Sequence, residues 1–391
     1  MIYSKYILKV GFKNKLNLIP LLIPIAIMIF LMIMNTQAIK STGYVPLLKD
    51  GIGIMERAFQ RQEGILKDES NLSEQDEKEI AEANTALGEN IQLTKQSITL
   101  AEEGRWTDSL AIQLKLMEEN ELHDIENGNI PDNENFAQHT FMKYSAYKQL
   151  SKLNAEPQYD GLEMKGTNYV YRMMDSIFPI IFLLCLIALI SNVVNSSIIG
   201  RIDIEKLFPE NPVKFHLKKI AILTLFGLLF YLFFIGAAFF LSSVLNGVGT
   251  LQYPINIYDT AGFGQTKPLI DIVTRAGILQ LLSLLFVISC VYLISILAKS
   301  GLTTLFVSTI AILGPIILTG QIAPIAKYLH ILPTTYVNSI RVVTNQLAFE
   351  NKNSLINFGN GILVLLISNL LIISIILVIK VRSRSREMLL N

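Results

Sequence analysis

The sequence predicts an all-α membrane protein with six transmembrane helices and a mainly helical extracytoplasmic domain inserted between helices one and two. The chain has 391 residues, of which 51% are hydrophobic, and a mean hydropathy of +0.45. That average exceeds what soluble domains normally reach, because they must cover their surface with polar groups. Six charge-free apolar stretches account for the excess, and most acidic residues gather between the first two stretches.

The six stretches are the predicted membrane spans, since a bilayer core about 30 Å thick needs roughly 20 apolar helical residues. They comprise residues 16–39, 176–200, 220–246, 276–298, 300–326 and 353–379. The first is too long for the core of a signal peptide and lacks a small-residue cleavage site, so we expect it to remain as an anchor. Only Lys299, Ser300 and Gly301 link spans four and five, which predicts a tight antiparallel hairpin.

Basic residues near the span ends predict the orientation. With the N-terminus inside, the inner segments hold 14 Lys and Arg residues, whereas the outer segments beyond the acidic domain hold five. We therefore expect both termini in the cytoplasm and residues 40–175 outside a bacterial cytoplasmic membrane. The predicted parts are a basic N-terminus with span one (1–39), the acidic domain (40–175), and a five-helix domain (176–391) with a cytoplasmic loop at 201–219 and a basic C-terminal tail.

The domain at 40–175 is acidic, with 14 Lys and Arg against 25 Asp and Glu, a net charge of −11. It contains no cysteine, which fits a bacterial surface. Ser73 and Asp76 predict a capping box at the start of a helix, and Gly104 predicts its end. An apolar seam runs along this helix, at Ile80, Leu87, Ile91 and Ile98. Thr107 or Asp108 is expected to cap a second helix, and a third is expected at about 134–153.

Recognisable catalytic signatures are absent from the sequence, which contains no Walker A motif, no G-x-S-x-G, no H-E-x-x-H and no C-x-x-C pair. The spans carry no charged residue at mid-depth, whereas ion-coupled carriers usually need one. Polar residues inside the spans form either a candidate substrate path or, more commonly, hydrogen bonds between helices. They are Asn192, Asn195, Gln280, Gln321 and Asn369.

The inner loop at 201–219 predicts a protein contact. It contains Asp203 and Glu205, then the exposed apolar pair Leu207 and Phe208 before Pro209, and it ends in a basic cluster. Exposed apolar groups in a short loop often mark an interface. The alternative is a helix lying at the lipid surface with its lysines towards head groups.

At this loop the chain resembles the permease subunits of ABC exporters of type 2. In that family an acidic residue after span two precedes a short coupling helix, a turn with proline and a basic residue that opens span three. The matching residues here are Glu205, Leu207, Phe208, Pro209 and Lys218 or Lys219. No Gly-Thr pair follows the acidic residue, so one family motif is missing. The order of one span, an outside domain and five spans also matches, and 332–348 resembles the family's extracellular half-helices.

The resemblance implies a transmembrane permease subunit of an ATP-driven exporter, bacterial and of Gram-positive type, with no catalysis of its own. A second permease subunit, identical or related, would complete a dimer, and separate ABC ATPase subunits would dock on the inner loop. The implied docking residues are Asp203, Glu205, Lys206, Leu207, Phe208 and Pro209. ATP and Mg²⁺ would be bound by the partner ATPase, so no cofactor is expected in this chain.

The substrate implied by the resemblance is hydrophobic: a peptide or bacteriocin, a lipid or a drug. Membrane lipids are expected partners, and nucleic acid is not. The alternative from another class is a membrane scaffold, surface receptor or secretion component with the same one-plus-five topology and no ATPase partner. A membrane enzyme ranks third, because no reactive constellation is visible in the sequence.

Overall fold

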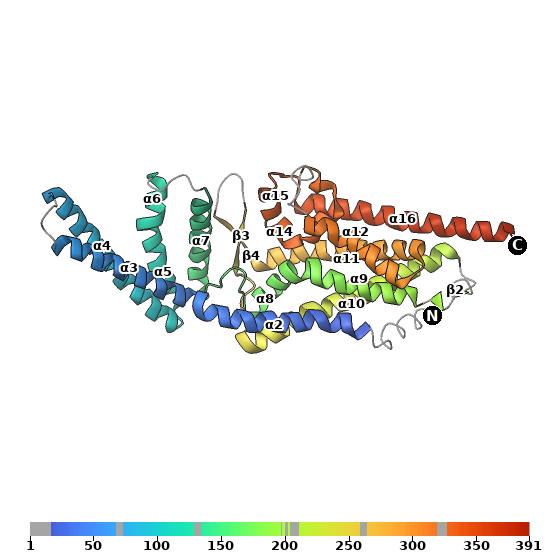
Figure 1. The fold of residues 1–391 in the computed structure, drawn as a ribbon, viewed down its shortest axis with the longest axis horizontal. Helices are drawn as coiled ribbons and strands as arrows, with labels where there is room; N and C mark the ends of the chain where they lie inside the picture. Colours follow the sequence, from blue (N-terminus) through green and yellow to red (C-terminus); the bar gives the residue numbers. More distant parts are fainter. Residues whose placement is uncertain are drawn as a thin grey trace. The chain divides into compact units, whose positions relative to one another are not determined.

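Figure 1 shows the fold in a computed structural model, which describes residues 17–67, 73–128, 134–196, 198–199, 202–203, 211–258, 264–318 and 327–390. Contacts divide the chain into two compact units, and each is described by itself. The apolar unit consists of the described parts of Met1–Leu31, Lys165–Val248 and Ile270–Asn391. The acidic unit consists of the described parts of Met32–Met164 and Gly249–Leu269.

Long helices dominate the apolar unit, and α2 continues from it into the acidic unit. They are α2 (Leu18–Thr42), α8 (Gly166–Arg172), the π-helix η3 (Met173–Phe182), α9 (Leu183–Asn195), α10 (Pro212–Asn246), α11 (Leu269–Ala298), α12 (Gly301–Leu318) and α16 (Phe358–Leu390). Six helical segments in the described part of the chain are long and apolar enough to cross a membrane: Leu18–Lys67, Gly166–Asn195, Val213–Asn246, Leu269–Ala298, Gly301–Leu318 and Phe358–Arg382. Their length and composition confirm the six predicted spans, although the second begins at Gly166 rather than at residue 176.

The second span forms the centre of the apolar unit. In its most apolar stretch 72% of the residues are buried, whereas in that of the last span 17% are. Rings of η3 and α10 pack together there, with Phe182 stacked on Phe230 at 4.6 Å and Phe178 edge-on to Tyr231 at 5.7 Å between ring centroids. Such aromatic pairs contribute about 0.5–1.5 kcal/mol each beyond the area they bury.

The fifth span packs closely against the second. The short link at Lys299 is present and has a positive φ of 54°. Beyond the link α12 contacts α9, and the tight hairpin between spans four and five stays a prediction. Asn195 contributes to the contact with α9, because its Nδ2 lies 3.4 Å from Oγ1 of Thr304 on α12.

Short helical segments fill the chain between α12 and α16. They are η5 (Leu329–Ile331), η6 (Pro333–Val337), α14 (Ser339–Val343) and α15 (Gln346–Glu350). The stretch at 332–348, which resembles the family's half-helices, is therefore helical in short segments. Tyr336 is fully buried, and its hydroxyl donates to the carbonyl of His330 at 2.7 Å.

The acidic unit is also mainly helical. Its elements are α3 (Tyr44–Lys67), α4 (Glu74–Glu102), α5 (Trp106–Met117), the π-helix η2 (Glu118–Leu122), α6 (His123–Glu126) and α7 (Glu134–Leu153). The predicted capping box is confirmed, since the Ser73 side chain accepts from the Asp76 backbone N–H at 3.2 Å and the Asp76 carboxylate accepts from the Ser73 N–H at 3.3 Å. Gly104 follows the end of α4 with a φ of +77°, as expected of a residue that terminates a helix.

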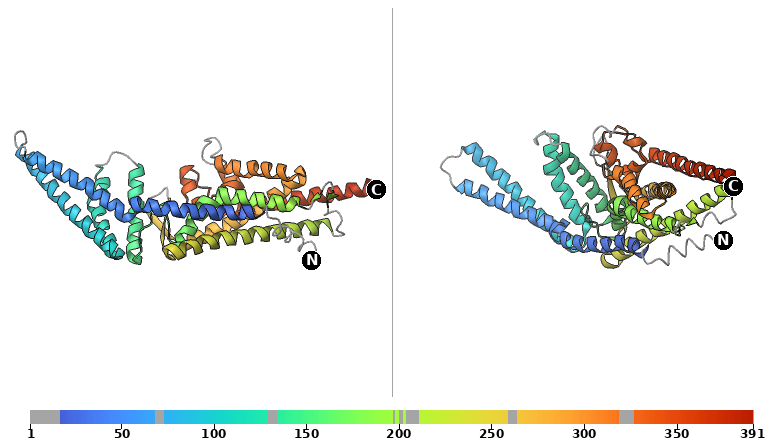
Figure 2. Two further views of the ribbon diagram at one scale, coloured as in Figure 1. Left: turned by 60° about the horizontal axis from the view of Figure 1, so that its bottom comes forward. Right: turned by 45° about the vertical axis from the view of Figure 1, so that its right-hand side comes forward.

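The pair α3 and α4 lies side by side along an apolar seam (Figure 2). Ile52 of α3 is buried against Ile91 and Ile98 of α4, while Leu87 packs beside them. The predicted seam is therefore present at those α4 positions, and the α3 partner comes from a segment for which no helix was predicted. Because only three side chains of this cluster are buried, the seam is a narrow one.

The start of α5 corrects a second expectation. Its N-cap is Arg105, whose side chain makes no capping hydrogen bond, so neither Thr107 nor Asp108 has the predicted role. The Thr107 N–H donates instead to Oδ1 of Asn154, just beyond α7, at 3.0 Å. The Thr107 hydroxyl donates to the Ser151 carbonyl of α7 at 2.7 Å. Asp108 accepts from the Arg105 guanidinium at 2.6 Å. The Thr107 hydroxyl, which the local sequence pattern predicted to cap α5, is thus used in a contact between α5 and α7.

Tyr44 is the central buried polar residue of the acidic unit. Its hydroxyl lies 3.1 Å from the Ser109 hydroxyl and 3.4 Å from that of Ser97. Its ring is edge-on to Trp106 and to Tyr147, with centroids at 5.8 and 5.9 Å. The start of α3 is thereby joined to α4, α5 and α7.

A β-hairpin from a distant part of the sequence completes the acidic unit. Strands β3 (Pro254–Ile257) and β4 (Gln265–Pro268) pair antiparallel and pack against α7. Tyr253 fixes the start of the hairpin, because its hydroxyl accepts from the Gln158 backbone N–H at 2.8 Å. The acidic unit therefore includes the described part of residues 249–269, which were predicted to belong to the five-helix domain.

Candidate functional site

The inner loop is the predicted docking site, and only part of it is described. After α9 ends at Asn195, the chain forms strands β1 (Ile198–Ile199) and β2 (Ile202–Asp203), which pair antiparallel. The backbone of Asp203 thus belongs to β2. The other predicted docking residues lie outside the described part of the chain: Glu205, Lys206, Leu207, Phe208 and Pro209. Their role stays a prediction.

The C-terminal end of this loop is the first turn of α10, and neighbouring residues in the sequence determine where that helix begins. Asn211 is the N-cap, and its side-chain oxygen accepts from the Val213 N–H at 2.9 Å. Pro212 follows at the first helical position, where its missing N–H costs nothing and its fixed φ suits the helix. A capped, proline-started helix gives the loop a defined end point on the apolar unit.

Basic residues in the next two turns of α10 divide into two groups. Lys214 and Lys218 are exposed, whereas Lys219 is only 2% exposed. The Lys219 ammonium lies 4.9 Å from the centre of the Tyr292 ring on α11. His216 is also buried, and its Nδ1 lies 2.5 Å from the Tyr292 hydroxyl oxygen. Of the two lysines that matched the family pattern, Lys219 therefore faces the protein.

These contacts fasten the loop end of α10 to α11. A desolvated cation–π pair contributes about 2 kcal/mol, and the hydrogen bond between His216 and Tyr292 adds a directional contact to it. A force applied at the loop would therefore reach both helices rather than bend the first turn of α10 alone. This is the mechanical property expected of a docking site whose partner moves.

The intramembrane polar residues bond to neighbouring helices. The Gln280 amide donates to the Met174 carbonyl of η3 at 3.0 Å and accepts from the Tyr231 hydroxyl of α10 at 2.7 Å. Asn369 donates from α16 to the Leu282 carbonyl of α11 at 3.2 Å. Their described contacts are those of helix-to-helix hydrogen bonds.

The remaining residues of the candidate path lie elsewhere. Asn195 contacts α12 near the inner loop, and Asn192 is exposed. Gln321 lies outside the described residues. Asn195, Gln280 and Asn369 thus each bond to a different neighbouring helix, and their role in a substrate path stays a prediction.

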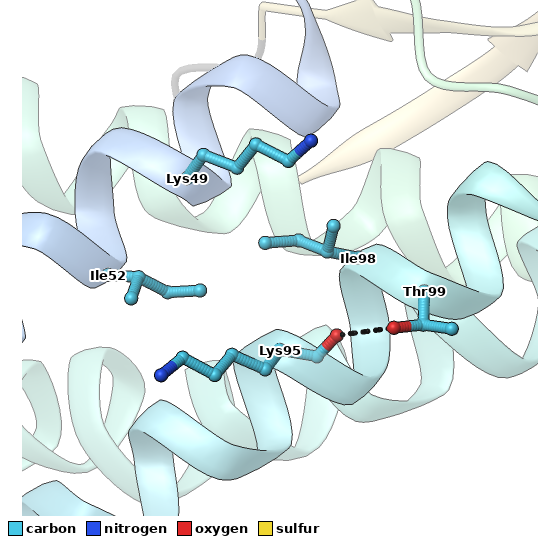
Figure 3. Close-up of a pocket in the computed structure, with 5 residues that line it drawn as sticks. All are labelled: Lys49, Ile52, Lys95, Ile98 and Thr99. Atoms are coloured by element: carbon cyan, nitrogen blue, oxygen red, sulfur yellow. Dashed lines mark hydrogen bonds between the residues drawn. The ribbon is translucent and has the colours of Figure 1, made fainter.

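A shallow depression on the acidic unit lies over the α3–α4 seam (Figure 3). Lys49, Ile52, Lys95, Ile98 and Thr99 line it, and the two lysine side chains extend in opposite directions. Each lysine pairs with a carboxylate on the facing helix, since both Lys49–Glu102 and Lys95–Glu56 measure 2.7 Å from Nζ to Oε1. The depression is thus the solvent-facing edge of a helix pair, with its charges matched.

The described part of the chain offers no cluster of metal-binding side chains. No group of three or more His, Cys, Asp or Glu side chains with metal-binding geometry occurs among the residues that the structure describes.

Comparisons with known proteins add no relative to this picture. No family model, curated protein or solved structure matches the chain.

Proposed function

We propose that this chain is the transmembrane permease subunit of an ATP-driven exporter, which moves or extracts a hydrophobic substrate with energy from separate ATPase subunits. The observation that carries the proposal is the connection between α9 and α10. A short polar segment with an apolar pair and a proline lies there between two apolar helices, and α10 is fastened to α11 directly behind it.

The chemistry of the spans supports a transporter that draws energy from a partner. A carrier driven by protons or ions needs titratable groups inside the membrane, whereas the sequence has no charged residue at mid-depth of a predicted span. Of the candidate path residues there, Asn195, Gln280 and Asn369 bond to other helices. In this proposal the chain is not an enzyme, and ATP and Mg²⁺ bind to the partner.

The proposed arrangement is a bacterial cytoplasmic membrane protein with both termini inside and the acidic unit outside. Two copies, or one copy and a related permease, would form the pathway, and two ATPase subunits would dock on residues 201–219. The hydrophobic cargo remains one of three classes: a peptide or bacteriocin, a lipid or a drug.

Co-purification tests the proposal. The chain would be co-expressed with the ABC ATPase that the proposal expects to be encoded beside it. Both would be purified in lipid nanodiscs, with the chain as wild type and as the loop variant Glu205→Lys with Leu207→Asp. We expect the wild type to retain the ATPase and the variant to lose at least about 90% of it, since removing central contacts of an interface costs about 2 kcal/mol or more.

The same Glu→Lys substitution at a distant position provides the control. Glu350→Lys changes an exposed carboxylate of α15, which pairs with Arg341 outside the loop, and should leave ATPase retention unchanged. Normal pairing after the loop substitutions would reject the docking site. Absence of any ATPase with the wild type would favour the scaffold or receptor alternative.

A further inference from the structure

The π-helix η3 contains a proline that selects between two backbone arrangements. In a π-helix each N–H bonds to the carbonyl five residues earlier, whereas in an α-helix it bonds to the carbonyl four residues earlier. Pro179 has no N–H. In the π arrangement the missing donor therefore belongs to the Met174 carbonyl. In an α arrangement Met174 would receive the N–H of Phe178, and the Asp175 carbonyl would lose its helical donor instead.

Gln280 supplies the donor that the π arrangement lacks. Its Nε2 lies 3.0 Å from the Met174 carbonyl oxygen, and its Oε1 accepts from the Tyr231 hydroxyl at 2.7 Å. The Gln280 side chain is fully buried and Tyr231 is only 6% exposed. An unpaired carbonyl at membrane depth costs several kcal/mol, and neighbouring helices are the usual source of a replacement.

The contact between Gln280 and Met174 is specific to one arrangement. It satisfies a carbonyl that is orphaned in the π form and is already occupied in the α form. We propose that Gln280 is a latch that holds η3 in its π form, and that η3 is a two-state element which converts to an α-helix when the latch opens.

Packing of η3 makes this element bistable rather than continuously deformable. Phe178 and Phe182 place their rings against Phe230, Tyr231 and Phe234 of α10. A change of helical register turns these rings away from their present partners, so each form requires its own packing. Close-packed interiors favour such discrete alternatives.

The conversion would reach beyond η3. It turns α8 about the helix axis relative to α9, and α8 is bonded to the end of α10. The Gly166 N–H donates to the Gly247 carbonyl at 2.9 Å, and the Thr167 N–H to the Val248 carbonyl at 2.8 Å. The latch would thereby link the outer half of the second span to the outer end of the third.

A double-mutant cycle tests the latch in the full-length chain in nanodiscs, without any ATPase. The variants are Gln280→Leu, Pro179→Ala and both together, with Tm as the readout. Gln280→Leu alone should lower Tm by about 2 °C or more. In the Pro179→Ala background the Met174 carbonyl can regain a helical donor, whereas the Tyr231 hydroxyl loses its partner in both backgrounds. The same substitution should therefore cost measurably less, but not nothing.

Asn369→Leu is the matched control, because Asn369 also donates an amide across helices but to the Leu282 carbonyl, away from Pro179. Its cost should be the same in both backgrounds. Equal costs of Gln280→Leu with and without Pro179 would reject the latch. A cost of Asn369→Leu that also shrinks would reject it too, because the cycle would then report a general change in stability.

A second readout follows the register directly and remains decisive if Pro179→Ala does not fold. With Cys185 and Cys290 replaced by alanine, a nitroxide spin label is attached at position 176 or 177. Ser176 is exposed and Ile177 is 3% exposed, so the first label should be mobile and the second immobilised. In Gln280→Leu the difference should shrink several-fold. Unchanged spectra at both positions would contradict the two-state element.

Discussion

Both units contain buried hydrogen-bonded polar side chains, but they differ in the further polar contacts that join their helices. In the apolar unit Gln280 and Asn369 are buried and donate to carbonyls of neighbouring helices. In the acidic unit the ion pairs of Lys49 and Lys95 lie at the surface, on either edge of an apolar seam. The contrast follows from the solvent, because each polar group in a bilayer needs a protein partner, whereas exposed ion pairs contribute about 0–1 kcal/mol in water.

This difference teaches where stability resides in each unit. The acidic unit depends on few buried side chains around Tyr44 and Leu110, and its many charges contribute little. The apolar unit depends on close helix contacts and on specific hydrogen bonds. Trp106, the single tryptophan of the chain, reports on the acidic unit alone, so the two units can be followed separately.

Alkaline pH should produce the largest difference in stability between the two units. Burial raises the pKa of Tyr147 and of Tyr253 above the usual value near 10. Because these pKa values are higher in the folded state than in the unfolded state, each tyrosine contributes fully to the free energy of unfolding below about pH 10. That contribution is lost as the pH rises further. We expect Trp106 fluorescence to show unfolding of the acidic unit above about pH 10. Tyr147→Phe should move this transition to higher pH, whereas the exposed Tyr159→Phe should leave it unchanged.

Leu110→Ala should produce the next largest effect. Leu110 is fully buried in α5, and removing such a side chain costs about 2–5 kcal/mol. Urea titration followed by Trp106 fluorescence should show a large fall in the midpoint for the acidic unit. Leu47→Ala, at a position 42% exposed on α3, is the control. A similar loss in both variants would show that Leu110 is not at the centre of the packing.

A smaller effect is expected in the apolar unit from Gly361→Ala. A Cβ there would lie 2.6 Å from Cδ1 of Tyr336 and 3.0 Å from Cδ2 of Leu279. Overpacking of this kind costs about 1–3 kcal/mol, so Tm in nanodiscs should fall while the Trp106 signal stays native. Gly277→Ala, where a Cβ meets nothing within 4 Å, should be neutral or stabilising. Equal effects would contradict the close contact of α16.

The smallest effect should come from Lys49→Met. Its ion pair with Glu102 is 57% and 53% exposed at the two side chains, and screening by water leaves at most about 0.5 kcal/mol. The urea midpoint of the acidic unit should hardly move, and raising the salt concentration should abolish any difference. A loss comparable to that of Leu110→Ala would overturn the comparison between surface charge and buried seam.

Long-range contacts explain what the sequence could and could not predict. Six spans and the capping box at Ser73 are local patterns, and both are confirmed. The hairpin around Tyr253 escaped prediction because its strands are short and its partner α7 lies about a hundred residues earlier. The cap at Thr107 failed for the same reason, since its hydroxyl bonds to Ser151 across the unit.

Helical register and side-chain packing explain where the structure of the second and third spans differs from the prediction. Apolar composition predicts a helix at 173–182 but does not distinguish a π-helix from an α-helix. The clue was available in Pro179. A proline has no N–H, so one carbonyl of the preceding turn in a buried span needs a donor from another helix. Gln280, which supplies it, was among the polar residues named as a candidate path. Lys218 and Lys219 were equivalent in sequence, and only packing against Tyr292 separates them.

Sidedness labelling in cells is the most direct test of the orientation on which the docking proposal depends. In a chain with Cys185 and Cys290 replaced by alanine, a membrane-impermeant maleimide would probe Ser73→Cys at the start of α4 and Lys214→Cys in the first turn of α10. We predict labelling of Ser73→Cys in intact cells and of Lys214→Cys only after permeabilisation. The reverse pattern, or labelling of both in intact cells, would contradict an outside acidic unit and an inner docking loop.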